Sequence, residues 1–421
     1  MSTISHPRWL APFRQSRSLD SFRLQNAGVV YALILMVVVL TVVSLIEGRP
    51  PYLSPINTAN VLDQTGIVGI LAVFMTIVLI SGNFDLSIGA IAVVVAGFSL
   101  MAEDRYGVLV SVVGGLLIGL AFGLVNGLLV QLVGINAFIV TLGTQTAIRA
   151  VLLIFTNGSS VQARGEGLYD LIGGNGSPLN LRIAAVVIGL VLLVAGAASM
   201  RQQRRRSQPI DLRTLALLVG GATLSIISWL VFPDEWPLSK QVYVMFALTI
   251  LCWAVLRFTI VGRRLYAVGG NGEAARLSGI NVAAYKIVPF ALNGCAAAIA
   301  GILYAGRFGA TNPNALTGIE LTVLAAAILG GTSLFGGAGS VVKSLVGALI
   351  LFVLGNGFNI LNLGSNYQGL IQGIVIIGAA GIYVIASRRG LGSGTQREGK
   401  DTVGAAQSDS TPSEPQSVRP A

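Results

Sequence analysis

Three polar side chains interrupt a long apolar stretch early in the chain: Asn83, Asp85 and Ser87. A carboxylate within such a stretch is costly to bury, so it is a functional candidate by default. Asp85 could line the path of a solute and accept hydrogen bonds from it. It could equally cap the helix that begins near Leu86, by accepting that helix's free backbone N–H groups. The sequence leaves both interpretations open.

A second glycine-rich break, Gly330–Gly337, resembles the first, Ser81–Gly89, and an Asn-Gly pair follows each of them. This pattern suggests a weak internal duplication, with chance similarity of glycine-rich segments as the alternative. Many transporters consist of two related halves around a central path. Irregular backbone at membrane depth is tolerated where it is buried in protein or lines a watery cavity. We therefore expect both breaks to flank one translocation path, near which hydrogen bonds are offered by Asn83, Asp85, Ser87, Thr332 and Ser333.

The residues of common catalytic and metal sites are scarce. The only histidine, His6, lies in the N-terminal tail, and both cysteines, Cys252 and Cys295, fall inside apolar runs as packing residues do. The nearest match to a phosphate-binding loop, Gly337–Ser344, lacks the glycine before its lysine and leads into an apolar run. We therefore predict no catalytic residue, no metal site and no cofactor bound by this chain.

A polar segment at residues 262–284 separates two long apolar runs. Asn271 can cap a short helix, Glu273 lies in its first turn where the helix dipole favours an anion, and Gly279 can end it. About seven helical residues span only about 10 Å. A helix of that length is not stable alone, so its flanking spans or a partner must hold it.

The elements that position these residues are membrane spans. The chain has 421 residues, is 54% hydrophobic and only 10% charged, whereas a soluble protein carries about 25% charged residues. We predict an all-α polytopic membrane protein of two pseudo-repeated halves, with about twelve transmembrane helices, some of them broken or re-entrant. The expected spans are 28–46, 62–81, 87–102, 107–132, 137–156, 182–199, 214–232, 241–261, 285–305, 319–333, 341–360 and 368–386. Arg149, inside one of them, must find a partner or extend toward the outer surface.

The net charge of +10 is concentrated before the first span, in alternate loops and after the last span. Cytoplasmic loops of membrane proteins carry such an excess of lysine and arginine, which predicts that both termini are cytoplasmic. Nucleic-acid binding is disfavoured because aromatic residues are not interleaved with these charges. The domains we expect are a cytoplasmic tail at 1–27, a transmembrane domain at 28–386 that includes the polar loop 262–284, and a disordered cytoplasmic tail at 387–421.

Four sequence blocks in one order now suggest a family: Asn83–Gly89, Asn136–Gly143, Gly262–Asn281 and Ala327–Gly337. The first resembles the Asp-Leu-Ser-x-Gly motif of ABC sugar-import permeases, and the others resemble further motifs of their ribose, xylose, arabinose and galactose branch. The two extra spans at 182–232 make the chain most similar to xylose-type permeases. Phe84 and Phe335 are bulkier than the residues usual there, which leaves the sugar undetermined.

The resemblance implies one permease of a homodimer or other pair, in a bacterial inner membrane, that imports a monosaccharide such as a xylose-type pentose. A periplasmic sugar-binding protein would deliver the sugar, and cytoplasmic ABC ATPase subunits would bind the ATP. Those subunits would dock on the Glu-Ala-Ala loop of 262–284, at Asn271, Glu273, Ala274, Ala275, Arg276 and Gly279. ATP-driven closure would move this loop as a lever and switch the path between its two openings.

Three rival functions remain. A proton-coupled secondary transporter needs titratable groups deep in the membrane, and the candidates Asp63, Asp85 and Glu320 all lie near the ends of spans. A passive channel has no feature in its favour that matches the Glu-Ala-Ala loop. Within the same superfamily, permeases for nucleosides or branched-chain amino acids are the alternative.

Overall fold

A computed structural model of the 421-residue chain describes residues 24–173, 181–205, 211–231 and 238–362, together with a few isolated positions elsewhere. Cα packing divides the chain into two units, Met1–Gln368 and Gly369–Ala421, and the first unit contains every element discussed below. Residues 1–23 of the expected N-terminal tail, the C-terminal tail and most of the span at 368–386 lie outside the described residues, whereas residues 24–27 of the expected tail belong to the first helix.

The described chain is helical almost throughout, as the sequence predicts. The helices are α1 Leu24–Ile46, α2 Pro55–Ile80, α3 Ile88–Tyr106, α4 Val108–Leu128, α5 Ala137–Thr156, α6 Leu181–Arg205, α7 Leu212–Val231, α8 Lys240–Phe258, α9 Ile260–Gly270, α10 Gly272–Leu277, α11 Val282–Phe308, α12 Ile319–Leu329 and α13 Val341–Ile360. Two π-helical segments are η2 Leu129–Val133 and η3 Tyr169–Gly173. The strands β1 Val161–Gln162 and β2 Ala310–Thr311 pair antiparallel, with Val161 opposite Thr311.

Among the described residues, seven helices are long and apolar enough to cross a membrane: α1, α2, α4 with η2, α5, α8, α11 and α13. The short span expected at 319–333 is indeed short, because α12 has 11 residues and spans about 16 Å, roughly half of a bilayer core. The span expected at 87–102 is one continuous helix, α3, of 19 residues. The total of twelve spans stays a prediction.

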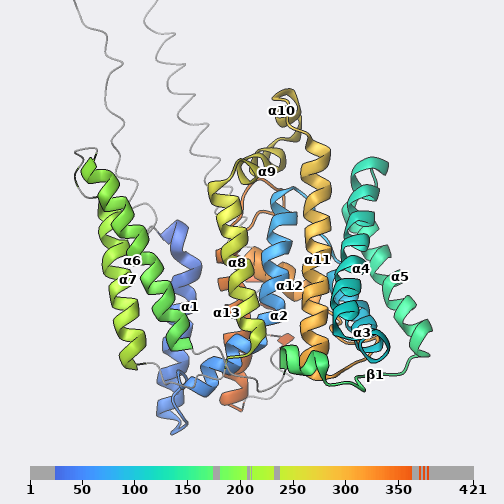
Figure 1. The fold of residues 1–421 in the computed structure, drawn as a ribbon, viewed down its shortest axis with the longest axis horizontal. Coiled ribbons are helices and arrows are strands. Elements are labelled where there is room, and N and C mark those ends of the chain that lie inside the picture. The colour runs from blue at the N-terminus through green and yellow to red at the C-terminus, as the bar shows by residue number, and fades with distance from the viewer. Residues whose placement is uncertain are drawn as a thin grey trace, which may run out of the picture. The chain divides into compact units, whose positions relative to one another are not determined.

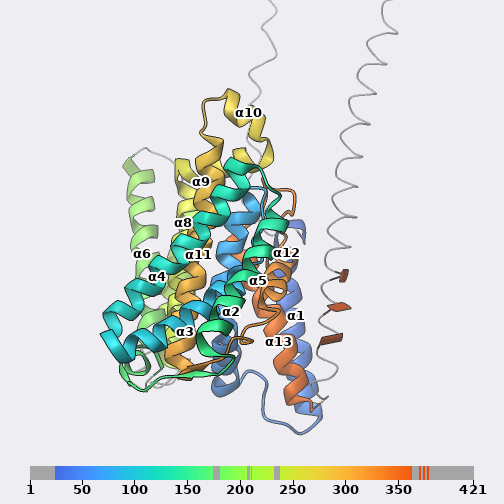
Figure 2. The same ribbon diagram turned by 90° about the vertical axis from the view of Figure 1, so that its right-hand side faces the viewer.

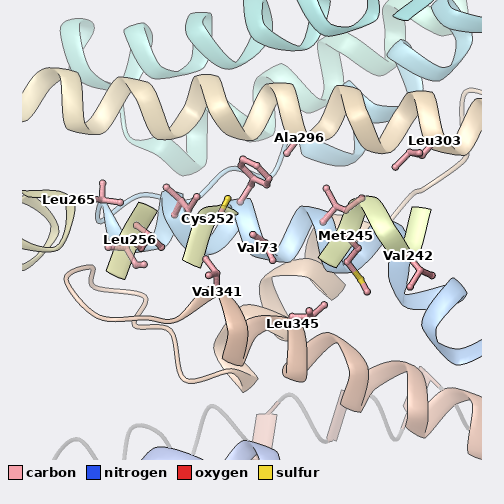
Figure 3. Packing of buried hydrophobic residues seen from close by; sticks show 14 of the residues in the cluster. Val73, Val242, Met245, Cys252, Leu256, Leu265, Ala296, Leu303, Val341 and Leu345 are labelled. Atoms are coloured by element: carbon pink, nitrogen blue, oxygen red, sulfur yellow. The ribbon is translucent and has the colours of Figure 1, made fainter. Parts of the chain in front are cut away.

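The packing centre of the bundle is α2. Of its most apolar window, 83% is buried, and it contacts α8, α11 and α13 on different sides. Figure 3 shows Val73 of α2 among Met245 and Cys252 of α8, Ala296 of α11 and Leu345 of α13. Lipid tails are as apolar as these side chains, so close contact between helices, rather than exclusion of water, stabilises such packing.

The two glycine-rich breaks begin with the same helix end. After α2, Gly82 has φ +84° and Asn83 N–H donates to Val78 O at 3.2 Å. After α12, Gly331 has φ +80° and Thr332 N–H donates to Ala327 O at 3.0 Å. A left-handed residue with such a backward bond is a frequent helix C-terminus. The similarity between the two breaks therefore extends from sequence to backbone.

Figure 1 shows the short helices α9 and α10 at one end of the bundle and β1 at the opposite end. The α9–α10 end carries four basic residues within a short stretch, Arg263, Arg264, Arg276 and Lys286, against the single acid Glu273. The β1 end includes Glu103 and Asp104, whose carboxylates accept backbone N–H groups of the 164–168 loop at 2.7–3.0 Å. The two ends therefore differ in charge.

Candidate functional site

The polar segment 262–284 forms two helices, α9 and α10, where the sequence predicted one. Thr259 restarts the chain as a helix directly after α8, because its hydroxyl accepts a hydrogen bond from Gly262 N–H at 3.3 Å. The predicted N-cap of the next helix is confirmed, since the side-chain oxygen of Asn271 accepts from Ala274 N–H at 2.9 Å. The predicted stop is confirmed too: Gly279 has φ +77°, a conformation that other residues adopt only at a cost.

The α10 helix presents an exposed surface at the tip of the bundle (Figure 2). Glu273, Ala274 and Arg276 are exposed, whereas Ala275 is buried and attaches the helix to its surroundings. Leu277 was not among the predicted docking residues, yet it is 82% exposed. A leucine within an otherwise polar loop was the available signal. At this exposed position the side chain is accessible to a partner.

Backbone contacts connect α9 to both glycine-rich breaks. A Cβ on Gly269, near the end of α9, would lie 1.7 Å from Ile80 O at the end of α2 and 2.7 Å from Gly337 N in the second break. Gly337 N–H also donates to Ile80 O at 2.9 Å. A Cβ on Gly336 would lie 2.8 Å from Gly82 Cα in the first break. We call the contact among Gly82, Gly269, Gly336 and Gly337 the glycine junction.

Asp85 lies in a polar network that is buried except at Thr144 and that ties the first break to three helices. Its Oδ1 accepts from Ser87 N–H at 2.9 Å and from the Ser87 hydroxyl at 2.6 Å, directly before α3 begins. Its Oδ2 accepts from the Asn293 side chain of α11 at 3.1 Å. Asn126 of α4 donates to the Ser87 hydroxyl at 2.8 Å and accepts from Thr144 of α5 at 2.8 Å. This geometry agrees with the capping interpretation of Asp85.

The polar side chains of the second break belong to a different network. The Thr332 hydroxyl lies 3.2 Å from that of Ser344 in α13, and Ser344 accepts from Thr76 of α2 at 2.7 Å. Ser333 stays within its own break, where its hydroxyl accepts from Phe335 N–H at 3.2 Å. Asn83 likewise contacts only its neighbour Ser81 among the described side chains, at 3.4 Å.

The structure thus brings the two breaks together through their backbones at the glycine junction, while their polar side chains bond to separate helices. The Asn-Gly pairs do not correspond, because Asn126 bonds to the first break whereas Asn356 of α13 donates to Asn57 of α2 at 2.9 Å. Whether Asn83, Asp85, Ser87, Thr332 or Ser333 contacts a solute stays a prediction.

Arg149 finds its partners within the protein. Its Nη1 donates to Pro313 O at 2.8 Å and to Ala315 O at 3.2 Å, both in the segment that leads into α12. The sequence left two possibilities for Arg149, a partner within the protein or extension toward the outer surface. The structure shows the first.

Comparison with known proteins identifies the family of the chain. The family described as branched-chain amino acid transport system / permease component matches residues 57–380. The xylose transport system permease protein XylH of Haemophilus influenzae is 34% identical over 365 residues, which cover 85% of this chain and 96% of the relative. The ribose import permease protein RbsC of Escherichia coli is 34% identical over 82% of this chain and 90% of its own. No solved structure matches the chain.

Proposed function

We propose that the chain is the membrane permease of an ATP-driven monosaccharide importer. It belongs to the family described as branched-chain amino acid transport system / permease component, and its sugar-permease relatives indicate the kind of substrate. Its similarity to a xylose and a ribose permease over more than four fifths of its length supports a pentose or a related sugar. The family resemblance of the four sequence blocks adds two further parts to the proposal: a location in the inner membrane and a periplasmic binding protein that delivers the sugar.

The projecting α10 helix is the observation that carries the energy-coupling part of this proposal. Its exposed Glu273, Ala274, Arg276 and Leu277 form a small surface at the basic end of the bundle. Because basic residues favour the cytoplasmic side, this end would face the cytoplasm and dock separate ATPase subunits. ATP would then bind to those subunits, and both termini of this chain would be cytoplasmic.

The glycine junction supports a mechanical role for α9. Four glycines let the end of α9 contact both breaks, backbone against backbone, with no flexible side chain between them. A force applied by the ATPases at α10 would pass through Asn271 to α9 and from there to Ile80 and Gly337. Packed interfaces of this kind shift between discrete arrangements and do not deform continuously. The two breaks would therefore move together when the path changes its opening.

Pairing with a second permease is part of the proposal. The outer face of α5 is exposed at Leu142, Gly143 and Thr146. The hydroxyl of Thr146 already donates to Leu142 O at 3.0 Å, so this face can border either protein or water. A second copy of the chain, facing α5 across a water-filled path, would complete the expected homodimer.

Branched-chain amino acid import is the second candidate, because the description of the family names that substrate. An uptake experiment with the binding protein loaded in turn with each solute distinguishes the two candidate functions. Uptake of xylose or ribose supports the proposal, and uptake of leucine alone supports the alternative.

Docking is tested with Leu277→Asp, which places a charge on the exposed tip of α10 and leaves its caps intact. We expect loss of ATPase co-purification and of ATP-dependent sugar uptake, with normal membrane insertion. Leu171→Asp is the matched control, since Leu171 is 52% exposed in η3 at the opposite end of the bundle. ATPase subunits that stay bound to the Leu277 variant would contradict docking at α10.

A further inference from the structure

A polar cluster outside both breaks joins α5 to α12. Gln145 Nε2 donates to Glu320 Oε1 at 2.7 Å. One turn further along α5, Arg149 holds the carbonyl groups of Pro313 and Ala315, just before α12. Two side chains of one α5 face therefore fix the start of α12, and Figure 2 shows both helices on the same side of the bundle. We call Gln145, Arg149 and Glu320 the α5–α12 cluster.

The cluster retains one acceptor and one donor without protein partners. Glu320 is 7% exposed, and its Oε2 is buried without a hydrogen bond among the described residues. The Nη2 atom of Arg149 is also buried without a hydrogen bond among the described residues, and no salt bridge joins Arg149 to Glu320. A buried carboxylate oxygen without a partner is expensive. The N-terminus of α12 stabilises the charge of Glu320 through its dipole, but no N–H of that helix reaches Oε2 in the structure.

These two atoms match the chemistry of a hydroxyl group. An ionised carboxylate only accepts hydrogen bonds and a guanidinium only donates them, whereas a hydroxyl does both. A molecule with several adjacent hydroxyls could donate one to Glu320 Oε2 and accept with another from Arg149. A water molecule could also bond to either atom. The case for a solute therefore depends on where the cluster lies in the structure.

Gln145 and Arg149 lie at the edge of the surface that the chain leaves uncovered, whereas Glu320 Oε2 is buried against Gly89 of α3, where an added Cβ would lie 2.8 Å from it. On α5, Gly143 and Thr146 are exposed and Gln145 and Arg149 are half-buried, while Val140, Ile148 and Leu152 are buried on the opposite side. The Asp85 network differs in this respect. Asp85 and Ser87 are 0% exposed, and both carboxylate oxygens of Asp85 already have partners.

We propose that the α5–α12 cluster is a contact site for a monosaccharide on its way through the membrane, with Glu320 accepting from a sugar hydroxyl and Arg149 donating to another. The proposal rests on the function proposed above and adds where the sugar binds. One or two such contacts hold the sugar weakly, which suits a site from which it must leave. The exposed α5 face would line the path, and the breaks would control its opening through the glycine junction.

The test uses the whole importer, with its ATPase and binding protein, in proteoliposomes supplied with xylose or ribose. Glu320→Leu removes the acceptor, and we expect sugar uptake to fall at least tenfold while ATP hydrolysis stimulated by the loaded binding protein persists. Glu320→Gln keeps one acceptor oxygen, so we expect partial recovery. Glu166→Gln, at an exposed position in the 164–168 loop at the β1 end of the bundle, is the matched control and should leave uptake unchanged.

A second measurement does not depend on the stability of a Glu320 variant. Thr146→Cys, in a background without Cys252 and Cys295, places a thiol on the exposed α5 face beside the cluster. We expect sugar to slow its modification by a water-soluble reagent during turnover. Normal uptake by Glu320→Leu, or modification of the Thr146 variant at an unchanged rate with sugar, would overturn the site. Failure of the unmodified importer to take up any sugar would instead contradict the proposed function.

Discussion

Replacing Gly269 by alanine tests the glycine junction at its tightest contact. The new Cβ would lie 1.7 Å from Ile80 O and 2.7 Å from Gly337 N. Both neighbours are backbone atoms, so no side chain can rotate away and the end of α9 has to move. The neighbouring Gly270 provides a matched control, because its Cβ would meet only Gly337 Cα, at 3.9 Å, an ordinary contact.

The size of the effect follows from three contributions. Overpacking a close contact costs about 1–3 kcal/mol, and losing the bond from Gly337 N–H to Ile80 O costs about 1 kcal/mol more. Alanine is the better helix former by about 1 kcal/mol, which offsets part of this. The net change of about 2 kcal/mol disfavours the present junction by roughly 30-fold relative to arrangements in which it is parted.

The assay compares sugar uptake, ATP hydrolysis and subunit association of the reconstituted importer for both alanine variants. We expect Gly269→Ala to retain ATPase association and to lose at least nine tenths of its uptake, because docking persists but the movement is no longer transmitted. Gly270→Ala should stay within about twofold of the unmodified protein, given its ordinary contact distance. Equal uptake by the two variants, at equal amounts in the membrane, would refute the reasoning.

Three further predictions concern the end of α10, the Asp85 network and the orientation of the bundle. Gly279→Val places a β-branched residue at φ +77° and should reduce ATPase association and uptake without affecting insertion; wild-type uptake would contradict this. Asp85→Asn keeps an acceptor for Ser87 N–H and should preserve most uptake, whereas Asp85→Leu should lose both uptake and stability, as measured by thermal aggregation; equal loss in both variants would show that the charge itself matters. Cysteines replacing Ser160 and Ser278, at opposite ends of the bundle, should react with an impermeant reagent from opposite sides of the membrane, and reaction from one side would exclude the proposed orientation.

The helices were predictable because long apolar runs between polar connections have few alternatives in a membrane. The caps of α10 were predictable for a similar reason, since Asn271 and Gly279 act through their own backbone and need no distant partner. The expected boundaries differ where a local cap decides them. The side chain of Ser54 begins α2 at Pro55, well before the expected residue 62, and after α8 the hydroxyl of Thr259 begins α9 within what reads as a continuous span.

Contacts between distant segments were not predictable from this one sequence. Nothing in the spacing of Gln145 and Glu320, which lie 175 residues apart, indicates that they bond. The glycine junction was not predictable either. The chain has 53 glycines, and nothing in the sequence distinguishes the four that meet. Asp85 is a middle case: its sequence position allowed a cap as one of two interpretations, but its bond to Asn293 depends on the packing of α11.

The central claim is that this permease couples ATP hydrolysis to import of a sugar. Its most direct test is uptake of labelled xylose and ribose by proteoliposomes that hold the permease with its ATPase and binding protein. ATP is supplied only on the side of α10, and a proton gradient is imposed separately. We predict accumulation of at least one sugar with ATP and none with the proton gradient alone. Sugar accumulation driven by the gradient without ATP, or ATP-driven uptake of leucine without uptake of either sugar, would contradict the account.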